Sequence, residues 1–389
     1  MMAMFPRRLT VPDRSFFLLG PRSTGKTTWL REKVPAARWY DLLLESELVR
    51  LLREPDRLRQ EVEALPPRSW VVIDEVQRLP SLLNAVHELL SRNAAAPRFV
   101  LTGSSARKLK KGQANLLAGR ALSRHFFPLV AQEFGREVPD VDRILRFGCL
   151  PQVMTEPDDK QRIGLLEAYG EMYLTEEVRA EAMVKNLASF SRFLEVAALM
   201  NGQVTNVSSL ARDAAVARPT VQGYFNVLVD TLLASWLPAF RPKARIKEVA
   251  HPKFYFFDTG VVRSLARRLR EPLESMERGA LLETYLHHEL KAYLHDEDCG
   301  GELSYWRTPG GLEVDFIWAR GTRHVAIEVK ASTRWRKEEA KALKELARSM
   351  PRVRPIAVYL GDCSLKDDEV DVWPLEVFLR ELYLGRVIS

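Results

Sequence analysis

Five short apolar runs mark the first third of the chain, and stretches with helical spacing lie between them. The runs have the length and residue types of β-strands, and they occupy residues 15–19, 38–42, 70–75, 98–101 and 125–129. Strands that alternate with helices are typical of parallel βαβ units. We therefore expect an α/β fold here, with a parallel sheet and helices on both of its faces.

A helix-turn-helix pattern follows in the middle of the chain. A short helix is predicted at 207–214 with Ser208 as its N-cap, and a longer helix is predicted at 219–232, where Pro219 suits the first turn. Two helices joined by a tight turn form the core of many DNA-binding domains. Two β-rich stretches follow, as the wing of a winged helix requires: residues 233–240 and 253–257.

Residues 312–318 and 324–330 both alternate between apolar and polar positions with a period of two, which predicts two β-strands. Gly321 and Thr322 lie between them. Glycine at the first central position suits a type II′ turn, so we expect a two-residue β-hairpin.

That hairpin pairs Asp315 directly with Glu328 and Glu313 with Lys330, and it places all four on one face. Like charges directly opposite each other on a sheet repel. A divalent cation between Asp315 and Glu328 would remove this penalty. The other face of the hairpin is expected to be apolar, covered by Val314, Phe316, Ile327 and Val329.

The first predicted strand runs directly into a phosphate-binding loop, GxxxxGK[ST]. Glycines let backbone N–H groups turn around phosphates, and the following helix adds its positive dipole end. Lys26 should reach the β- and γ-phosphates, and the Thr27 hydroxyl should ligate Mg²⁺. The predicted nucleotide-binding residues of this loop are Gly20, Pro21, Arg22, Ser23, Thr24, Gly25, Lys26, Thr27 and Thr28.

Two later strands supply further candidates for the same site. The strand at 70–75 ends in Asp74, which fits the Walker-B aspartate that holds Mg²⁺, and in Glu75, which is placed to polarise an attacking water. Thr102 or Ser104, after the strand at 98–101, is a candidate sensor of the γ-phosphate. A simple hydroxyl-stabilised turn is the alternative for these two residues.

Basic residues gather after the fourth strand. Arg120 is a candidate arginine finger, which would stabilise transition-state charge either within its own subunit or across a subunit boundary. The run at 107–111 (RKLKK) could follow a phosphate backbone, although a solvated basic face is equally consistent with it.

The motifs GPRSTGKTT, VVIDEV, LTGSSA, LAGRA and FFPLVAQEF, in this order, resemble a group of prokaryotic AAA+-type ATPases. Members of that group join the ATPase core to a C-terminal winged-helix and nuclease-like region. The segment KFYFFDTG at 253–260 also resembles this group. The resemblance implies binding of ATP and Mg²⁺, and assembly into a homo-oligomer.

The C-terminal hairpin resembles the D…ExK arrangement of the PD-(D/E)xK nucleases. In that resemblance Asp315 and Glu328 bind Mg²⁺ or Mn²⁺, and Lys330 positions or activates the attacking water. Glu283, on a preceding helix, would be a further acidic member of the site. The alternative is a half-buried hairpin with a polar face, although two apolar residues on that face indicate that something covers it: Ile317 and Ala326.

If the helix-turn-helix binds DNA, its second helix is the recognition helix. Arg218, Thr220 and Gln222 would begin it, and Tyr224 could lie on the DNA backbone. The segment between the two β-rich stretches has a composition suited to phosphate contacts and contributes Arg241, Lys243, Arg245 and Lys247. A helix-turn-helix used only for packing or subunit contact is the alternative.

Composition narrows the class of protein. Hydrophobic residues make up 46% and charged residues 28%, as in globular proteins. No stretch resembles a signal peptide or a membrane span, and the cysteines at 149, 299 and 363 are too far apart for a zinc motif or a disulfide framework. We therefore expect a cytoplasmic protein without membrane contact.

The net charge of +7 is unevenly distributed. Residues 1–135 hold 22 basic and 13 acidic side chains (+9), residues 136–275 hold 19 and 18 (+1), and residues 276–389 hold 17 and 20 (−3). The surplus favours a polyanionic partner such as DNA. A metal-dependent nuclease would reconcile the acidic C-terminal third with such a partner.

We therefore expect three domains: a P-loop ATPase at 1–135, a helical connector (165–199) with a winged helix at 136–275, and an α/β nuclease-like domain at 276–389. The leading hypothesis is an ATP-hydrolysing, DNA-binding protein of DNA processing with a metal-dependent nuclease domain. The alternative is a nucleotide-dependent switch or adaptor whose nuclease-like domain binds DNA or protein without cutting. A small-molecule kinase is disfavoured by the Asp74-Glu75 pair.

Overall fold

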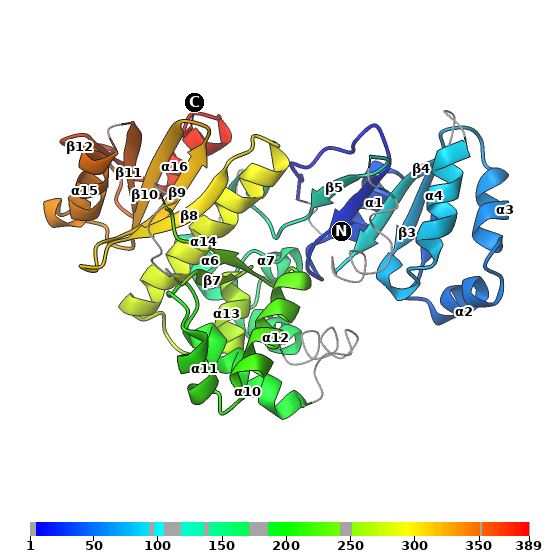
Figure 1. The fold of residues 1–389 in the computed structure, drawn as a ribbon, viewed down its shortest axis with the longest axis horizontal. Coiled ribbons are helices and arrows are strands. Elements are labelled where there is room, and N and C mark those ends of the chain that lie inside the picture. The colour runs from blue at the N-terminus through cyan, green and yellow to red at the C-terminus, as the bar shows by residue number, and fades with distance from the viewer. Residues whose placement is uncertain are drawn as a thin grey trace. The chain divides into compact units, whose positions relative to one another are not determined.

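The computed structural model describes residues 5–92, 97–104, 117, 119–135, 140–170, 186–241, 251–350 and 352–388. The chain divides into two compact units (Figure 1). The N-terminal unit comprises Pro6–Leu129 and Asp230–Leu233, and the C-terminal unit comprises Met1–Phe5, Val130–Val229 and Ala234–Ser389. Apart from Asp230–Leu233, the segments expected to form a second and a third domain both belong to the C-terminal unit.

The N-terminal unit is built on a five-stranded sheet in the order β2-β3-β4-β1-β5, and every neighbouring pair is parallel. This confirms the expected parallel sheet. In chain order the strands are β1 (Phe16–Leu19), β2 (Arg38–Asp41), β3 (Trp70–Asp74), β4 (Arg98–Gly103) and β5 (Leu122–His125).

The fifth strand was predicted at 125–129, but β5 is Leu122–His125. The apolar residues beyond it are buried for another reason, because the chain leaves the sheet after Phe126, whose N–H still donates to the Leu19 carbonyl of β1 (2.7 Å). The Phe126 ring packs against Trp29 with ring centroids 5.4 Å apart. Side-chain packing beneath the sheet, and not ladder pairing, therefore accounts for this apolar run.

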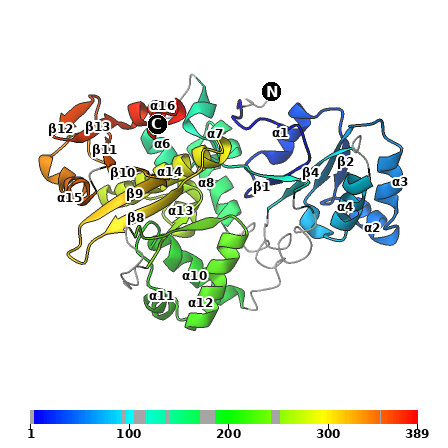
Figure 2. The same cartoon turned by 45° about the horizontal axis from the view of Figure 1, so that its top comes forward.

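Helices cover both faces of this sheet, as alternate residues of β1 show. Phe16 and Leu18 share a core with Trp29 and Leu30 of α1, whereas Phe17 and Leu19 belong to a second core with residues of the other helices. Figure 2 shows this layered arrangement. The helices are α1 (Lys26–Lys33) on one side and, on the other, α2 (Glu45–Arg53), α3 (Arg57–Glu63) and α4 (Leu82–Arg92).

The C-terminal unit begins with helices and a two-stranded sheet. Its helices up to that sheet are α6 (Val141–Phe147), α7 (Pro151–Thr155), α8 (Asp159–Ala168), α10 (Leu187–Leu199), α11 (Val207–Asp213) and α12 (Arg218–Asp230). Strands β6 (Ala234–Leu237) and β7 (Lys253–Phe256) then pair antiparallel. Part of the predicted connector, residues 171–185, lies outside the described residues.

The elements expected of a winged helix are thus present in the expected order, with one corrected cap. The side chain of Asn206 accepts hydrogen bonds from the backbone N–H groups of Ser208 (3.0 Å) and Ser209 (3.2 Å), so Asn206, and not Ser208, caps α11. Asparagine, like serine, can accept hydrogen bonds from the free N–H groups of a helix's first turn, so the cap lies two residues earlier than predicted. The identification as a winged helix stays a prediction.

The rest of the C-terminal unit is a six-stranded mixed sheet in the order β12-β13-β11-β10-β9-β8. Its strands are β8 (Glu302–Arg307), β9 (Glu313–Arg320), β10 (Arg323–Lys330), β11 (Val353–Tyr359), β12 (Leu365–Asp367) and β13 (Val370–Pro374). Its helices are α13 (Thr259–Leu265) and α14 (Ser275–Asp296) before the sheet, then α15 (Lys341–Ser349) and α16 (Leu375–Tyr383).

Helices cover both faces of the β9–β10 hairpin. On one face Ile317 and Ala326 share a core with Leu343 and Leu346 of α15, which is the cover that these two apolar residues indicated. On the other face Phe316 stacks on His287 of α14 with ring centroids 6.1 Å apart. Within the described ranges, no helix has both the length and the apolarity needed to cross a bilayer.

Candidate nucleotide site and carboxylate cluster

The predicted phosphate loop joins the end of β1 to the start of α1. The Gly20 N–H donates to the Gly103 carbonyl at the end of β4 (3.2 Å). A Cβ at Gly20 would lie 2.2 Å from the Phe126 carbonyl oxygen, so no larger residue fits. Gly25, with φ of 93°, turns the chain into α1 through the left-handed region that favours glycine. The loop contains Gly20, Pro21, Arg22, Ser23, Thr24 and Gly25, and the first turn of α1 contains Lys26, Thr27 and Thr28.

The Lys26 ammonium lies inside this loop. Its Nζ donates to the carbonyl oxygens of Gly20 (2.7 Å) and Pro21 (2.8 Å), and the residue is only 6% exposed. A lysine held at the mouth of a loop at a helix N-terminus provides a positive charge together with backbone N–H donors. This combination suits a polyphosphate.

Asp74, at the end of β3, lies between two hydroxyl groups. Thr27 donates to Asp74 Oδ2 (2.9 Å), and Thr102 of β4 donates to Asp74 Oδ1. A hydroxyl and a carboxylate in contact are oxygen ligands that Mg²⁺ accepts at phosphate sites. The donor set of Thr27 and Asp74 therefore fits the expected metal.

Glu75 follows in an unusual backbone conformation. Its φ is 58°, in the left-handed region, which is uncommon for a residue with a Cβ and is found preferentially at functional sites. Its N–H donates to the Thr102 hydroxyl (3.0 Å), and its carboxylate accepts from the Gln77 amide. Gln77 also donates to Ser104 Oγ (3.1 Å). Thr102 and Ser104 thus hold the two acidic residues in place, and a role in sensing the γ-phosphate stays a prediction.

Sequence reasoning missed two residues of this site. Gln77 lies in the 3₁₀ turn Val76–Arg78 and positions the Glu75 carboxylate. Arg7 donates to the carbonyl oxygens of Thr24 (2.8 Å) and Phe127 (2.6 Å), which ties the loop to the segment after β5. No motif marks an isolated arginine or glutamine, so neither was detectable from spacing.

Two further predictions in the N-terminal unit concern basic residues. Arg120 lies in an exposed turn before β5, and its role as an arginine finger stays a prediction. The basic run at 107–111 lies outside the described residues.

In the C-terminal unit, the predicted hairpin has the expected turn and register. Gly321 has φ of 59°, and the pairs run from Arg323 opposite Arg320 to Ile327 opposite Phe316. The ladder stops there, one position before Asp315 and Glu328 would face each other. The direct pairing of Asp315 with Glu328, and of Glu313 with Lys330, was therefore wrong.

A β-bulge explains this departure. Ser304 of β8 pairs with Ile317, but Trp306 pairs with Val314, so one residue of β8 stands opposite two residues of β9. Such a bulge reverses the alternation of the bulged strand. Val314 accordingly shares a core with Ile317, and not with Phe316 as expected. The bulge falls at Asp315, whose Oδ2 accepts from the Val329 N–H (2.9 Å).

The acidic residues of β9 face a lysine that sequence reasoning did not assign to the site. Lys253 Nζ, from β7, lies 2.7 Å from Glu283 Oε1, 2.6 Å from Glu313 Oε1 and 3.6 Å from Asp315 Oδ1. We call these four residues the carboxylate cluster. Lys253 is 2% exposed. The sequence feature that could have indicated this role is a single lysine in an otherwise apolar strand.

Burial and neighbouring charges shift the pKa values of Glu283 and Lys253. Burial, together with the nearby Asp315 charge and against the opposing charge of Lys253, raises the pKa of Glu283 to about 7. Burial lowers the pKa of Lys253, but the charges of Glu283, Asp315 and Glu313 outweigh this effect and hold the pKa above its ordinary value. Lys253 is therefore protonated at neutral pH.

Glu328 and Lys330 form a separate ion pair beside the cluster. Lys330 Nζ donates to Glu328 Oε1. Burial raises the pKa of Glu328 well above its usual range, and the Asp315 charge acts in the same direction. Glu328 Oε2 is buried without a hydrogen-bond partner, which is the one feature here that would suit a cation.

The expected metal site at Glu283, Asp315 and Glu328 does not fit this arrangement. Among the side chains that the structure describes, no group of three or more His, Cys, Asp or Glu residues is arranged to hold a metal ion. Lys253 already supplies a cation to Glu283 and Asp315. The carboxylates of this cluster therefore do not fit a divalent metal.

The N-terminal unit is similar to a known family. Residues 12–135 match the AAA domain family. The match supports an ATP-binding, AAA-type ATPase fold and, with it, the binding of nucleotide. The rest of the chain matches two domains of unknown function, DUF8612 over residues 138–271 and DUF4143 over residues 278–378.

The chain is also similar to individual proteins. Two uncharacterized proteins, from Mycobacterium bovis and Mycobacterium tuberculosis, are each 27% identical over 319 residues, which covers 81% of this chain and 70% of theirs. The solved structure of the Aeropyrum pernix ORC2 protein aligns with 14% identity and a TM-score of 0.26, over 66% of this chain and 89% of that one. A TM-score this low does not establish a shared overall fold.

Outside the AAA domain, the predicted DNA contacts fall into three groups. Arg218, Thr220 and Gln222 are exposed at the start of α12, and Arg241 is exposed after β6. Tyr224 is 4% exposed, and its ring packs at 5.0 Å from that of Phe190, so it cannot lie on a DNA backbone as expected. It falls on the buried stripe of α12. The third group lies outside the described residues: Lys243, Arg245 and Lys247.

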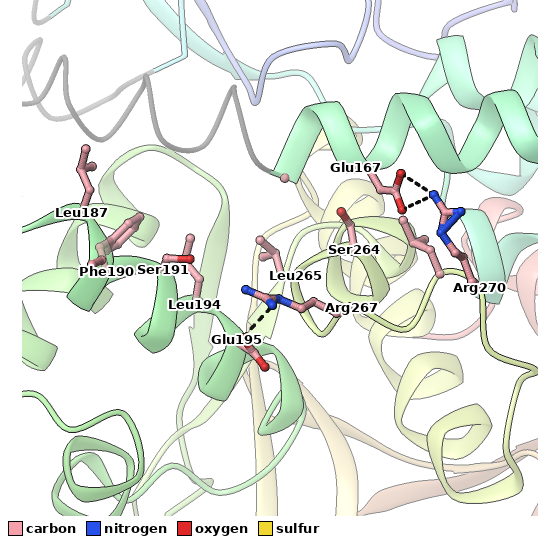
Figure 3. A pocket seen from close by; sticks show the side chains of 13 residues that line it. Glu167, Leu187, Phe190, Ser191, Leu194, Glu195, Ser264, Leu265, Arg267 and Arg270 are labelled. Carbon is pink, nitrogen blue, oxygen red and sulfur yellow. Dashed lines mark hydrogen bonds and ion pairs between the residues drawn. The ribbon is translucent and has the colours of Figure 1, made fainter.

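The C-terminal unit also has a pocket of about 700 Å³, shown in Figure 3. Residues of α8, α10 and α13 and the turn after α13 line it, and two ion pairs lie among them: Arg267 with Glu195 (3.3 Å) and Arg270 with Glu167 (2.8 Å). None of the predicted site residues lines this pocket. Its lining includes Gly170 and Leu187, on either side of residues 171–185, which lie outside the described residues, and we assign it no function.

Proposed function

We propose that this chain is an ATP-hydrolysing switch: the AAA domain turns over ATP, and the C-terminal unit binds DNA without cutting it. The arrangement of Lys26, Thr27, Asp74 and Glu75 around one loop carries the first part of this proposal. It provides a cation for the phosphates, an oxygen pair for Mg²⁺ and a carboxylate for the water.

Each residue would have a distinct task during hydrolysis. Lys26 would leave the carbonyl oxygens of the loop and contact the β- and γ-phosphates. Thr27 and Asp74 would hold Mg²⁺, which neutralises phosphate charge when bound. Glu75 would orient and polarise the attacking water, with its carboxylate held by Gln77. Arg120, which is exposed, would reach the nucleotide of a neighbouring copy in a homo-oligomer.

Replacing Lys26 by alanine tests the nucleotide site. We expect the affinity for a fluorescent ATP analogue to fall at least tenfold, because a charge-assisted contact to phosphate is worth roughly 1.5–3 kcal/mol. Lys33→Ala is the matched control, since Lys33 is a half-exposed lysine at the other end of the same helix, paired with Glu32. Equal affinity of wild type and Lys26→Ala in a binding titration would remove the site from this loop.

The start of α12 supports the DNA-binding part of the proposal. Three exposed polar residues there, Arg218, Thr220 and Gln222, stand on the helix that follows the turn. This is the position from which helix-turn-helix proteins contact DNA.

We expect Arg218→Ala to weaken binding of duplex DNA to the full chain and to reduce the salt slope of log affinity by about one, as the loss of one phosphate contact requires. Tyr224→Phe should leave both quantities unchanged, because that side chain is buried. Fluorescence anisotropy at several salt concentrations measures both. Identical slopes for wild type and Arg218→Ala would argue for a packing role of this helix.

A nuclease remains the second candidate, because the partnerless Glu328 Oε2 beside Lys330 would suit a cation. Labelled single-stranded, duplex and branched DNA incubated with Mg²⁺ or Mn²⁺ separates the two candidates. The proposed switch leaves all of these substrates intact. Cuts that Asp315→Ala abolishes would replace it with the nuclease.

A further inference from the structure

The carboxylate cluster has an internal cation with a fixed position. The Lys253 ammonium lies within ion-pair distance of Glu283, Glu313 and Asp315, at 2.7, 2.6 and 3.6 Å. These residues come from different parts of the C-terminal unit: Lys253 from β7, Glu283 from α14, and the other two from β9. One side chain therefore connects the two-stranded sheet, a helix and the six-stranded sheet.

The backbone of Lys253 is held on both sides. It pairs with Leu237 of β6 and, through an isolated bridge, with Val204. Beside it, the Thr205 N–H donates to the Pro252 carbonyl (2.9 Å). The backbone of Lys253 is therefore fixed between β6 and the bridged segment at Val204, and the ion pairs with Glu283 and Glu313 hold its ammonium at the carboxylates.

Neighbouring aromatic residues complete the surroundings of this ammonium. Lys253 Nζ lies 5.5 Å from the centre of the Tyr305 ring, a distance at which a cation is attracted to the ring face. Tyr305 is held in turn by backbone hydrogen bonds with Pro238 (2.9 Å) and Phe240 (2.6 Å). On the other side, Tyr255 donates its hydroxyl to Glu283 Oε1.

A divalent ion would have to compete with this ammonium for the same oxygens. Mg²⁺ requires its oxygen ligands at 2.0–2.1 Å. A bound metal would also lie within a few ångströms of a buried positive charge, where repulsion is strong because screening by water is weak. Lys253 and a metal at Asp315 and Glu283 are therefore mutually exclusive.

We propose that Lys253 is the resident cation of the carboxylate cluster, that it takes the place of a divalent metal there, and that the cluster fastens the two-stranded sheet to the six-stranded sheet. The inference rests on the proposed non-cutting role of the C-terminal unit and gives that role a structural cause. It makes no use of ATP hydrolysis, so the two can fail separately.

Binding of Mn²⁺ to the full-length chain without nucleotide, followed by electron paramagnetic resonance, tests this inference. We expect Asp315→Asn to leave the Mn²⁺ binding of the wild type unchanged, because the wild-type cluster binds none. We expect Lys253→Met to gain a Mn²⁺ site, with binding at least about tenfold tighter than that of the wild-type chain, since a buried like charge has been removed. Adding Asp315→Ala to Lys253→Met should abolish the gain.

Lys344→Met is the matched control, because Lys344 also lies between carboxylates of the C-terminal unit, at 2.7 Å from both Asp367 and Asp368, and should give no gain at the cluster. A wild-type Mn²⁺ site that Asp315→Asn removes would overturn the inference, and this comparison does not require Lys253→Met to fold. A folded Lys253→Met without tighter Mn²⁺ binding would overturn it as well. Phosphate release from ATP, measured on the same samples, reports separately on the AAA domain.

Discussion

Replacing Glu75 by glutamine is expected to lower ATP turnover by about 10²–10³-fold and to leave ATP binding close to that of the wild type. A positioned general base contributes roughly 10²–10⁴-fold to a rate, and an amide cannot take that role. Binding should survive because the proposed contacts to phosphate and Mg²⁺ come from Lys26, Thr27 and Asp74, which this substitution leaves in place. Steady-state phosphate release and a titration with a fluorescent ATP analogue measure the two quantities.

The structure explains why the effect should be confined to turnover. Gln77 and Ser104 hold the Glu75 side chain, and both groups can also bond an amide. The left-handed φ of 58° is set by the backbone and needs no carboxylate. Glu54→Gln is the control, because it removes an exposed carboxylate from the same unit. Turnover of Glu75→Gln equal to that of this control would assign the base to another residue.

The largest expected effect on stability comes from Arg263. Its guanidinium is completely buried, with Nε 3.0 Å from Glu277 Oε1 and Nη2 donating to the carbonyl oxygens of Arg268 (2.7 Å) and Glu271 (2.8 Å). Arg263→Met keeps most of the side-chain volume but leaves a carboxylate and two carbonyl oxygens without this donor. Removing one partner of a buried ion pair costs about 3–5 kcal/mol, and we expect this loss in the free energy of unfolding.

Chemical denaturation of the full chain, followed by a probe of the C-terminal unit, measures that loss. Arg267→Met provides the contrast within the same segment: Arg267 is 74% exposed and lies 3.3 Å from Glu195, so its loss should cost less than about 1 kcal/mol. Because Glu277 lies in the first turn of α14, the Arg263 variant should also loosen the helix that carries Glu283. Equal stability of the two variants would contradict this account of the buried pair.

The geometry of the phosphate loop could be predicted from the sequence because the loop is local. A phosphate loop needs its glycines, lysine and threonine at fixed spacing, and the strand before it is recognisable from its apolar run. The contact between Thr27 and Asp74 follows from the parallel sheet, because the carboxyl ends of β1 and β3, the two strands on either side of β4, lie at the same edge. Gln77 and Arg7 were not predictable in this way, because they act through single contacts and belong to no recurrent pattern.

The β9–β10 hairpin was predicted only in part. The Gly321-Thr322 turn and the register up to Phe316 and Ile327 were predicted correctly, since a two-residue turn fixes the pairing on both sides of it. The bulge at Asp315 was missed because its cause lies in β8, the strand on the other side of β9. No property of the hairpin sequence alone indicates that, at the bulge, one residue of β8 stands opposite two residues of β9.

Lys253 was missed for a related reason. Apolar periodicity predicts which positions are buried, and it assigns a lysine to the surface by default. The burial of Lys253 depends on carboxylates that follow 30 or more positions later in the chain. Tyr224 is the opposite case, a residue assigned to a surface although its spacing from Val221 and Phe225 already placed it on the buried stripe of α12.

Phosphate release from ATP by the full chain, in the presence and absence of Mg²⁺ and alongside Lys26→Ala, tests the central claim most directly. We expect Mg²⁺-dependent release by the wild type and none above background by Lys26→Ala, because that variant lacks the cation proposed to contact the phosphates. Release by Lys26→Ala at the wild-type rate, or a folded wild type that releases no phosphate with Mg²⁺, would contradict it.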